Sequence, residues 1–229
     1  MSRRTLNKTE GSINPATKFL EWKSNDKCFA YYDRDAKEKV NVHLPLKVQF
    51  LEHFHTVKGW NDASESGIYA NEVKFISKEP LKVKSFKGGD IAEGLYSEIR
   101  GKLRDAGGKY YRSVYAVLDG EIVNLQLKGA CVSAYSEFMQ SYENQLESAW
   151  TEILTVSDHK KGATKYSTPD FTVGKLFTSK EVEVANEKYT DIANYFNEYT
   201  KEIEVDVKET EPYDLKPPRQ GIDEDEIEF

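Results

Sequence analysis

The chain has 229 residues and a formal net charge of −7, and 38% of its residues are hydrophobic while 31% are charged. This composition is typical of a soluble globular protein that is long enough to bury a core. The longest stretch without Asp, Glu, Lys or Arg is the eight residues 129–136. A membrane-spanning helix needs about 20 apolar residues, so we exclude an integral membrane protein.

The N-terminal residues are basic, but no apolar run follows them. We therefore expect no secretory signal and a cytoplasmic location. The only two cysteines, Cys28 and Cys131, lie in apolar surroundings. They fit a reducing compartment and packing in the core better than a disulfide framework.

The acidic charge is concentrated at the C-terminus. Residues 209–229 contain eight acidic and two basic residues, which leaves 30 basic and 31 acidic residues in 1–208. The body of the chain is therefore almost neutral. Its whole-chain charge says little about what the body binds.

The first half of the chain predicts short strands separated by polar turns. Residues 1–15 are polar and we expect a flexible arm. The clearest strand is 40–50, where apolar and polar residues alternate and Pro45 indicates an edge or a bulge. Further strands are predicted at 19–23, 28–32, 67–76 and 81–86.

The next segment predicts a helix and then a hairpin. Apolar residues recur every four positions from Ile91 to Leu103, behind Asp90 as an N-cap, so we expect a helix over 90–106. Two strands at 110–118 and 121–127 flank Asp119-Gly120, a strong signal for a hairpin turn.

The last third predicts two more helices around a second hairpin. The helices are expected at 130–147 and 179–203, and the hairpin strands at 153–156 and 166–173. Thr178 and Glu181 have the spacing of a capping box at the start of the last helix. The heptad-like apolar spacing of that helix suits a homodimer seam and packing on the body equally.

These elements predict one α+β domain over 16–206. We expect an antiparallel, OB-like Greek-key β-barrel with inserted and C-terminal helices, because a barrel leaves few open strand edges. Residues 207–229 contain three prolines and few apolar residues, so we expect a disordered acidic tail.

Enzyme motifs are absent from the sequence. There is no Walker A loop and no Gly-x-Ser-x-Gly elbow. His53 and His55 would share a strand face and could hold a metal, but no third ligand stands at a recognised spacing. We expect a non-enzymatic protein without metal or cofactor. A nuclease whose carboxylates meet only in the fold remains an alternative.

Aromatic residues make up 12% of the chain, and several stand among cations rather than in apolar runs. Single-stranded nucleic acid requires this mixture, because cations contact phosphates and aromatic rings stack on unpaired bases. The plainer interpretation is that the tyrosines are strand formers and the lysines solvate the surface.

The tail favours the nucleic-acid interpretation. Residues 221–229 contain five acids, no bases and a terminal Phe229. A tail that only confers solubility needs neither Ile227 nor Phe229. Such a peptide suits docking in a hydrophobic pocket of a partner, and it could also compete with phosphate for the protein's own binding groove.

The tail is similar to the acidic, Phe-terminated tails of replicative single-stranded DNA-binding proteins of bacteria and bacteriophages, most of all the phage type. The segments 44–51, 57–62, 112–116 and 126–129 resemble single-stranded DNA-binding proteins of phages that infect gut Bacteroidetes. The resemblance implies an OB-fold that binds single strands without sequence preference. It also implies recruitment of replication proteins, polymerase and helicase-primase, through the tail, with Phe229 as the terminal aromatic. The helices exceed those of a minimal OB-fold, and the acidic run is shorter than in some relatives.

We therefore expect a single-stranded DNA-binding protein for phage DNA replication or recombination, acting in the cytoplasm of the bacterial host. The alternative is a protein–protein adaptor or virion-assembly factor that binds no nucleic acid. The stacking candidates are Tyr31, Tyr32, Trp60, Tyr110, Tyr111 and Tyr115. The phosphate-contact candidates are Lys39, Lys47, Lys82, Lys84, Arg100, Lys102, Arg104, Lys109, Arg112 and Lys128. The partner-binding candidates are Asp223, Glu224, Asp225, Glu226, Ile227, Glu228 and Phe229.

Overall fold

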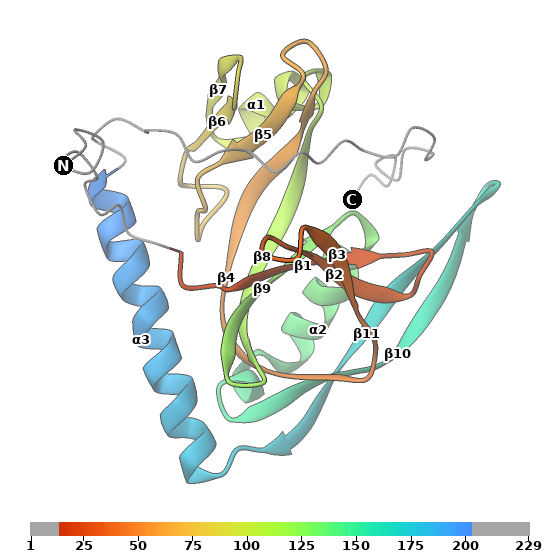
Figure 1. Ribbon diagram of the computed structural model, residues 1–229, viewed down its shortest axis with the longest axis vertical. Helices are drawn as coiled ribbons and strands as arrows, with labels where there is room; N and C mark the ends of the chain where they lie inside the picture. The colour runs from red at the N-terminus through yellow and green to blue at the C-terminus, as the bar shows by residue number, and fades with distance from the viewer. Residues whose placement is uncertain (1–13, 203–229) are drawn as a thin grey trace.

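Eleven strands and three helices make up the part of the chain that the structure, a computed structural model, describes, residues 14–202 (Figure 1). The tail residues 223–229 and most of the N-terminal arm lie outside that range. The elements are β1 (Lys18–Lys23), β2 (Cys28–Asp33), β3 (Glu38–Val42), β4 (Leu46–Asn61), β5 (Ser66–Ala70), β6 (Leu81–Ser85), β7 (Gly89–Gly94), α1 (Tyr96–Asp105), β8 (Gly108–Leu118), β9 (Glu121–Lys128), α2 (Ala130–Leu146), β10 (Ala149–Lys161), β11 (Thr164–Leu176) and α3 (Ser179–Glu202).

The fold is α+β, as predicted, and it is dominated by one sheet. The strands follow the order β3-β2-β1-β9-β8-β4-β5-β6-β7, and β10 joins the far end of β4 and carries β11. The pairing of β1 with β9 is parallel, and the other pairings of the described strands are antiparallel. The path through the described strands ends at β3 and β7 without pairing them. The observed sheet is therefore open.

The predicted strand 40–50 is two strands. β3 ends at Val42 and β4 begins at Leu46, with Pro45 between them. Pro45 lacks an N–H for a ladder and divides the run. The predicted alternation still holds on both sides of the break, because Val42, Leu46 and Val48 all contribute to the same apolar cluster.

The helix predicted over 90–106 is wrong in its first third. Residues Gly89–Gly94 form β7, which pairs with β6, and α1 begins only at Tyr96. Gly94 has φ 147°, a conformation that suits glycine and separates strand from helix. The Glu98 carboxylate accepts a hydrogen bond from the Leu95 N–H at 3.3 Å and fixes the actual start of the helix. The strand predicted at 67–76 is also shorter, because β5 ends at Ala70.

Other local predictions are confirmed. β8 and β9 form a hairpin whose two turn residues, Asp119 and Gly120, both have positive φ, as a type I′ turn requires. The α2 and α3 helices lie where they were predicted. Thr178 and Glu181 form the capping box, with the Thr178 N–H donating to the Glu181 carboxylate at 2.7 Å and the Glu181 N–H donating to the Thr178 hydroxyl at 3.4 Å. Both cysteines are buried and reduced.

Three apolar clusters pack on the sheet. The largest lies between the sheet, α2 and the β10–β11 hairpin, and a smaller one lies under α3. The third belongs to the lobe formed by β5, β6, β7 and α1. α3 packs on the body through Ile192, which is 1% exposed, and Phe196, whose ring stacks on Phe54 at 3.9 Å. Its Val182 and Tyr189 are exposed.

None of the helices in residues 14–202 combines the length and apolar character needed to cross a membrane.

Candidate nucleic-acid interface

The register of the sheet sorts its side chains onto two faces. Paired residues in neighbouring strands lie on the same face, and successive residues alternate between faces. Tyr32 pairs with Lys39, Tyr111 with Lys128, and Lys58 with Lys109. The β1–β9 and β8–β9 registers, Glu21 with Gln126 and Gln126 with Ser113, place all of these pairs on one face.

We call this side the basic face. It lies on the same side of the sheet as α3 and consists of the part that α3 does not cover. Its cations are all lysines, and its aromatic side chains come from four of the strands. The basic face consists of Phe19, Lys23, Tyr32, Lys39, Lys58, Trp60, Lys109, Tyr111 and Lys128.

Lysine ammonium groups lie over aromatic rings at the centre of this face. The Lys58 Nζ is 5.3 Å from the centroid of the Phe19 ring, although the two residues belong to β4 and β1. The Lys128 Nζ is 5.9 Å from the centroid of Tyr111. Such cation–π contacts are worth only about 0.5–1 kcal/mol at exposed sites.

An acidic side chain, Glu21, lies among these lysines, and a second one, Glu72, lies near Lys58. The Glu21 carboxylate is 2.9 Å from the Lys23 Nζ. Burial alone would raise the Glu21 pKa, but the nearby charges of Lys23, Lys128 and Lys58 outweigh it and hold the pKa below its usual value. Three lysines thus converge on one carboxylate, and the cluster keeps a positive excess.

Lys58 is partly buried between the strands. Loss of water around its ammonium group lowers its pKa, against the attraction of Glu72 and Glu21, which raises it. Lys58 lies over the Phe19 ring at the centre of the basic face. It is therefore a phosphate-contact candidate, although it was not among the predicted ones.

Tyr115 shares this face but lies under α3, and its selection as a stacking residue is wrong. Its side chain has no exposed surface and packs against Phe54 and Phe196. The hydroxyl donates to the Glu72 carboxylate at 2.7 Å and accepts from the Asn14 amide at 2.9 Å. Tyr111 is also mostly buried, at 6% exposure, so little of its ring is open to a base.

Three other residues that were predicted as DNA contacts lie on the opposite face of the sheet. Tyr31 packs against the apolar cluster under α2, as does Tyr110. The Arg112 Nη1 donates to the His55 Nε2 at 3.0 Å, and the His55 Nδ1 is 2.5 Å from the Tyr110 hydroxyl. The side chains of Arg112, His55 and Tyr110 thus contact one another inside the protein. The prediction of Tyr31, Tyr110 and Arg112 as DNA contacts is therefore wrong.

The two histidines do share a face, as predicted. The His53 Nδ1 is 3.2 Å from the Tyr135 hydroxyl. Burial and the neighbouring Arg112 charge lower the pKa of His53 to about 4 and that of His55 to about 3, so both rings are neutral at pH 7. Within residues 14–202, no three His, Cys, Asp or Glu side chains are grouped so that they could hold a metal ion.

The remaining predicted cations lie at the margins. Lys82 and Lys84 extend the basic face onto β6, but Lys82 faces Glu93 at 3.7 Å and Lys84 pairs with Asp90 at 3.0 Å. Three others are exposed on α1, which covers the opposite side of the lobe; these are Arg100, Lys102 and Arg104.

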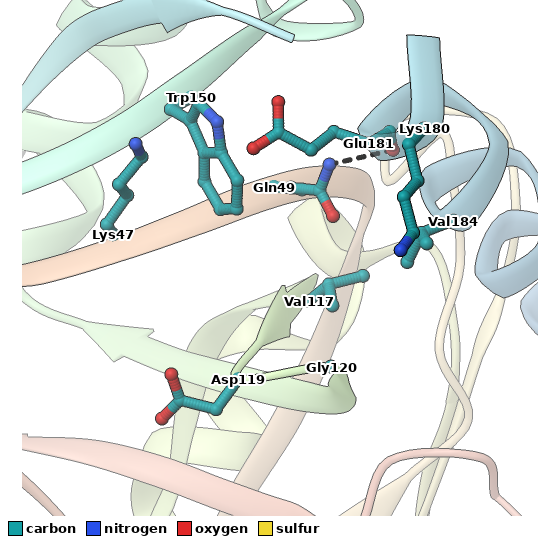
Figure 2. A pocket seen from close by; sticks show the side chains of 9 residues that line it. All are labelled: Lys47, Gln49, Val117, Asp119, Gly120, Trp150, Lys180, Glu181 and Val184. Carbon is teal, nitrogen blue, oxygen red and sulfur yellow. Dashed lines mark hydrogen bonds between the residues drawn. The ribbon is translucent and has the colours of Figure 1, made fainter. Parts of the chain in front are cut away.

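Lys47 lines a pocket away from the basic face, together with Gln49 and Trp150 (Figure 2). The pocket has a volume of about 390 Å³ and lies between β4, β10, the β8–β9 turn and the first turn of α3. The Lys47 Nζ is 4.4 Å from the centroid of Trp150, and the Gln49 side chain donates to the Glu181 carbonyl at 2.9 Å. Two lysines and two acids balance its charge, so it does not continue the basic face.

Sequence reasoning missed Phe19, Lys23 and Lys58. The spacing of Lys58 and Trp60, two residues apart on one strand, already indicated a shared face. Phe19 and Lys23 reach the site only because β1 pairs in parallel with β9, more than 100 residues away. No local sequence pattern predicts the pairing of β1 with β9.

No family model, curated protein or solved structure matches the chain.

Proposed function

We propose that the protein binds single-stranded DNA, without sequence preference, across the basic face. The observation that carries the proposal is that three lysines and three rings share one sheet surface; these are Lys23, Lys58 and Lys128 with Phe19, Tyr32 and Trp60. This surface offers both parts that an unpaired strand needs: cations for its phosphates and rings for its bases. An exposed sheet is also broad enough for a flexible strand.

Contacts to phosphate explain the expected lack of sequence preference. Lysine contacts a phosphate as a point charge and reads no base edge. The candidate rings, Phe19, Tyr32 and Trp60, accept any base, because every base has a stacking face. Binding should weaken with salt, by about 0.7 in the logarithm of affinity per logarithm of salt for each phosphate neutralised.

An OB-like barrel remains part of this proposal. The long β4 strand supports it, because it pairs successively with β10, β8 and β5 and contains a bulge at Leu51. Bulged, strongly bent strands turn the corners of small barrels. The long loop-and-helix insertions would then lie around a barrel core formed by the central strands.

The acidic tail gives the protein its second role in this proposal. Residues 223–229 would recruit replication proteins such as polymerase and helicase-primase, as in phage DNA replication or recombination. The tail would also compete with DNA for the basic face by mimicking phosphate charge. Deletion of residues 221–229 should therefore tighten oligonucleotide binding and abolish capture of those partners.

Fluorescence titration with oligo-dT at 50 and 200 mM salt tests the proposal. Trp60 lies on the basic face, whereas Trp22 is buried at 7% exposure and donates to the Ser167 carbonyl. We expect quenching that Trp60→Phe removes and that salt weakens. An adaptor or virion-assembly factor predicts no quenching at either salt concentration. A nuclease predicts metal-dependent shortening of the oligonucleotide in the same sample.

A further inference from the structure

The β10–β11 hairpin extends away from the body as a two-stranded ribbon (Figure 1). Its base pairs with β4 through Thr151–Ile153, whereas its outer half, beyond Thr155, pairs only β10 with β11 among the described strands. The tip carries three exposed lysines, Lys160, Lys161 and Lys165. No acidic residue occurs from 159 to 169.

Two of these lysines face each other across the ribbon. Lys160 and Lys165 are directly paired in the register of β10 and β11. Like charges in directly opposite positions destabilise a sheet. An exposed ribbon has no packing reason to keep such a pair, so the repulsion itself points to an anionic ligand.

The pair lies on the side of the ribbon that contacts the β1–β2 turn, while the ribbon itself packs on the α2 side of the sheet. Lys160 and Lys165 share their side of the ribbon with Asp158 and Ser167, two residues further in. Asp158 is 2.7 Å from the Lys27 Nζ, and the Ser167 N–H donates to the Ser24 hydroxyl at 2.6 Å. Lys23, at the end of the basic face, directly precedes this turn. Asp158, the acidic residue on this side of the ribbon, is already paired with Lys27.

We infer that the ribbon tip is a second contact for the phosphate backbone, which grips the strand after it passes Lys23. This inference rests on the proposed function and extends its site. The chemistry of the tip favours a polyanion with repeated charges, because Lys160 and Lys165 would each neutralise one phosphate. On the other side of the tip, the His159 and Tyr166 rings stack at 5.0 Å, which stiffens the ribbon without occupying the lysines.

The test compares Lys160→Gln/Lys165→Gln with wild type on dT8 and dT30. The shorter oligonucleotide covers only the basic face, whereas the longer one also reaches the ribbon. For dT30 we expect roughly 50- to 100-fold weaker binding at 50 mM salt and a salt slope about 1.4 smaller, as two lost phosphate contacts require. Binding of dT8 should stay within about twofold of wild type, and the melting temperature should not fall, because a repulsive pair has been removed.

The matched control is Lys78→Gln/Lys175→Gln, which removes two exposed lysines elsewhere and should leave both affinities unchanged. A variant that binds dT30 with the wild-type affinity and slope overturns the ribbon contact but not the proposed function. Equal losses on dT8 and dT30 with a lower melting temperature also overturn it, since they indicate damage to the fold. Wild-type protein that binds neither oligonucleotide overturns both proposals. Binding of a poly-glutamate peptide that requires Lys160 and Lys165, with dT30 unaffected, assigns the tip to an acidic protein instead.

Discussion

The two faces of the central sheet both carry cations beside aromatic rings, but they use them in opposite ways. On the face toward α2, Arg112 donates to His55, and the Tyr110 and Tyr135 hydroxyls contact the two histidines. On the basic face, Lys58 and Lys128 rest over rings, and three lysines surround one carboxylate. The comparison teaches that the partners of a cation, rather than its presence among aromatics, decide whether it can take up a phosphate.

The largest effect is expected from the basic face. Lys58→Gln/Lys128→Gln should weaken oligo-dT binding roughly 100-fold at low salt and reduce the salt slope by about 1.4, because two phosphate contacts are lost. Fluorescence titration over a salt series measures both values. Arg100→Gln/Lys102→Gln on α1 is the control and should bind like wild type. If the control weakened binding as much as the test variant, the DNA would have to lie on the α1 side.

Removing the arginine of the opposite face should affect stability instead. Arg112→Met leaves the buried His55 Nε2 without its donor, which we expect to lower the free energy of unfolding by about 2 kcal/mol. Urea denaturation measures this change. The folded variant should bind oligo-dT with wild-type affinity. Weaker binding at unchanged stability would instead show that Arg112 contacts DNA.

The neutral histidines predict a stability that depends on pH. Their pKa values of about 4 and 3 lie below the ordinary value near 6.5. Between pH 6.5 and 4 the unfolded chain binds protons that the folded protein does not, so stability is complete above pH 6.5 and falls as the pH falls. Each histidine contributes at most about 1.4 kcal/mol per pH unit, and less because both retain some contact with water.

His53→Gln/His55→Gln should flatten this slope between pH 6.5 and 4, as measured by urea denaturation at several pH values. Protonation of carboxylates with lowered pKa values, such as Glu21, also reduces the stability of the folded protein in acid, but the reduction is the same in both proteins. The difference between wild type and variant therefore isolates the histidines. Parallel curves for the two proteins would show that the rings are protonated in the folded state.

The smallest effect is expected at Tyr115. Tyr115→Phe removes the donor to Glu72 and the acceptor for Asn14, while the ring keeps its packing. We expect a loss of up to about 1 kcal/mol in thermal or urea denaturation and no change in oligo-dT affinity. Weaker DNA binding by this variant would mean that α3 moves aside to expose the ring.

The parts of the fold that local signals determine were predictable. The Asp119-Gly120 turn and the Thr178–Glu181 capping box are set by a few adjacent residues, and both are found where the sequence placed them. The helix prediction was wrong for residues 89–94 because the apolar residues from Ile91 onward recur every four positions, as they do in a helix. The segment is a strand because it pairs with β6 and has a glycine with positive φ at each end.

The candidate site was only partly predictable, because strand parity does not reveal which side a helix covers. Tyr111 and Tyr115 have the same parity in β8, yet α3 packs over Tyr115 and leaves Tyr111 beside Lys128. Tyr110 and Arg112 flank Tyr111 in the sequence and point to the other face. The clusters of basic and aromatic residues seen in the sequence thus grouped side chains that lie on opposite faces of the sheet.

Lysine footprinting tests the central claim most directly. The protein is acetylated at limiting reagent with and without saturating dT30, and the modification of each lysine is measured by mass spectrometry. The account predicts strong protection of Lys23, Lys58 and Lys128, and no protection of Lys78, Lys102 or Lys175. Protection of Lys102 with continued modification of Lys58 and Lys128 would contradict it.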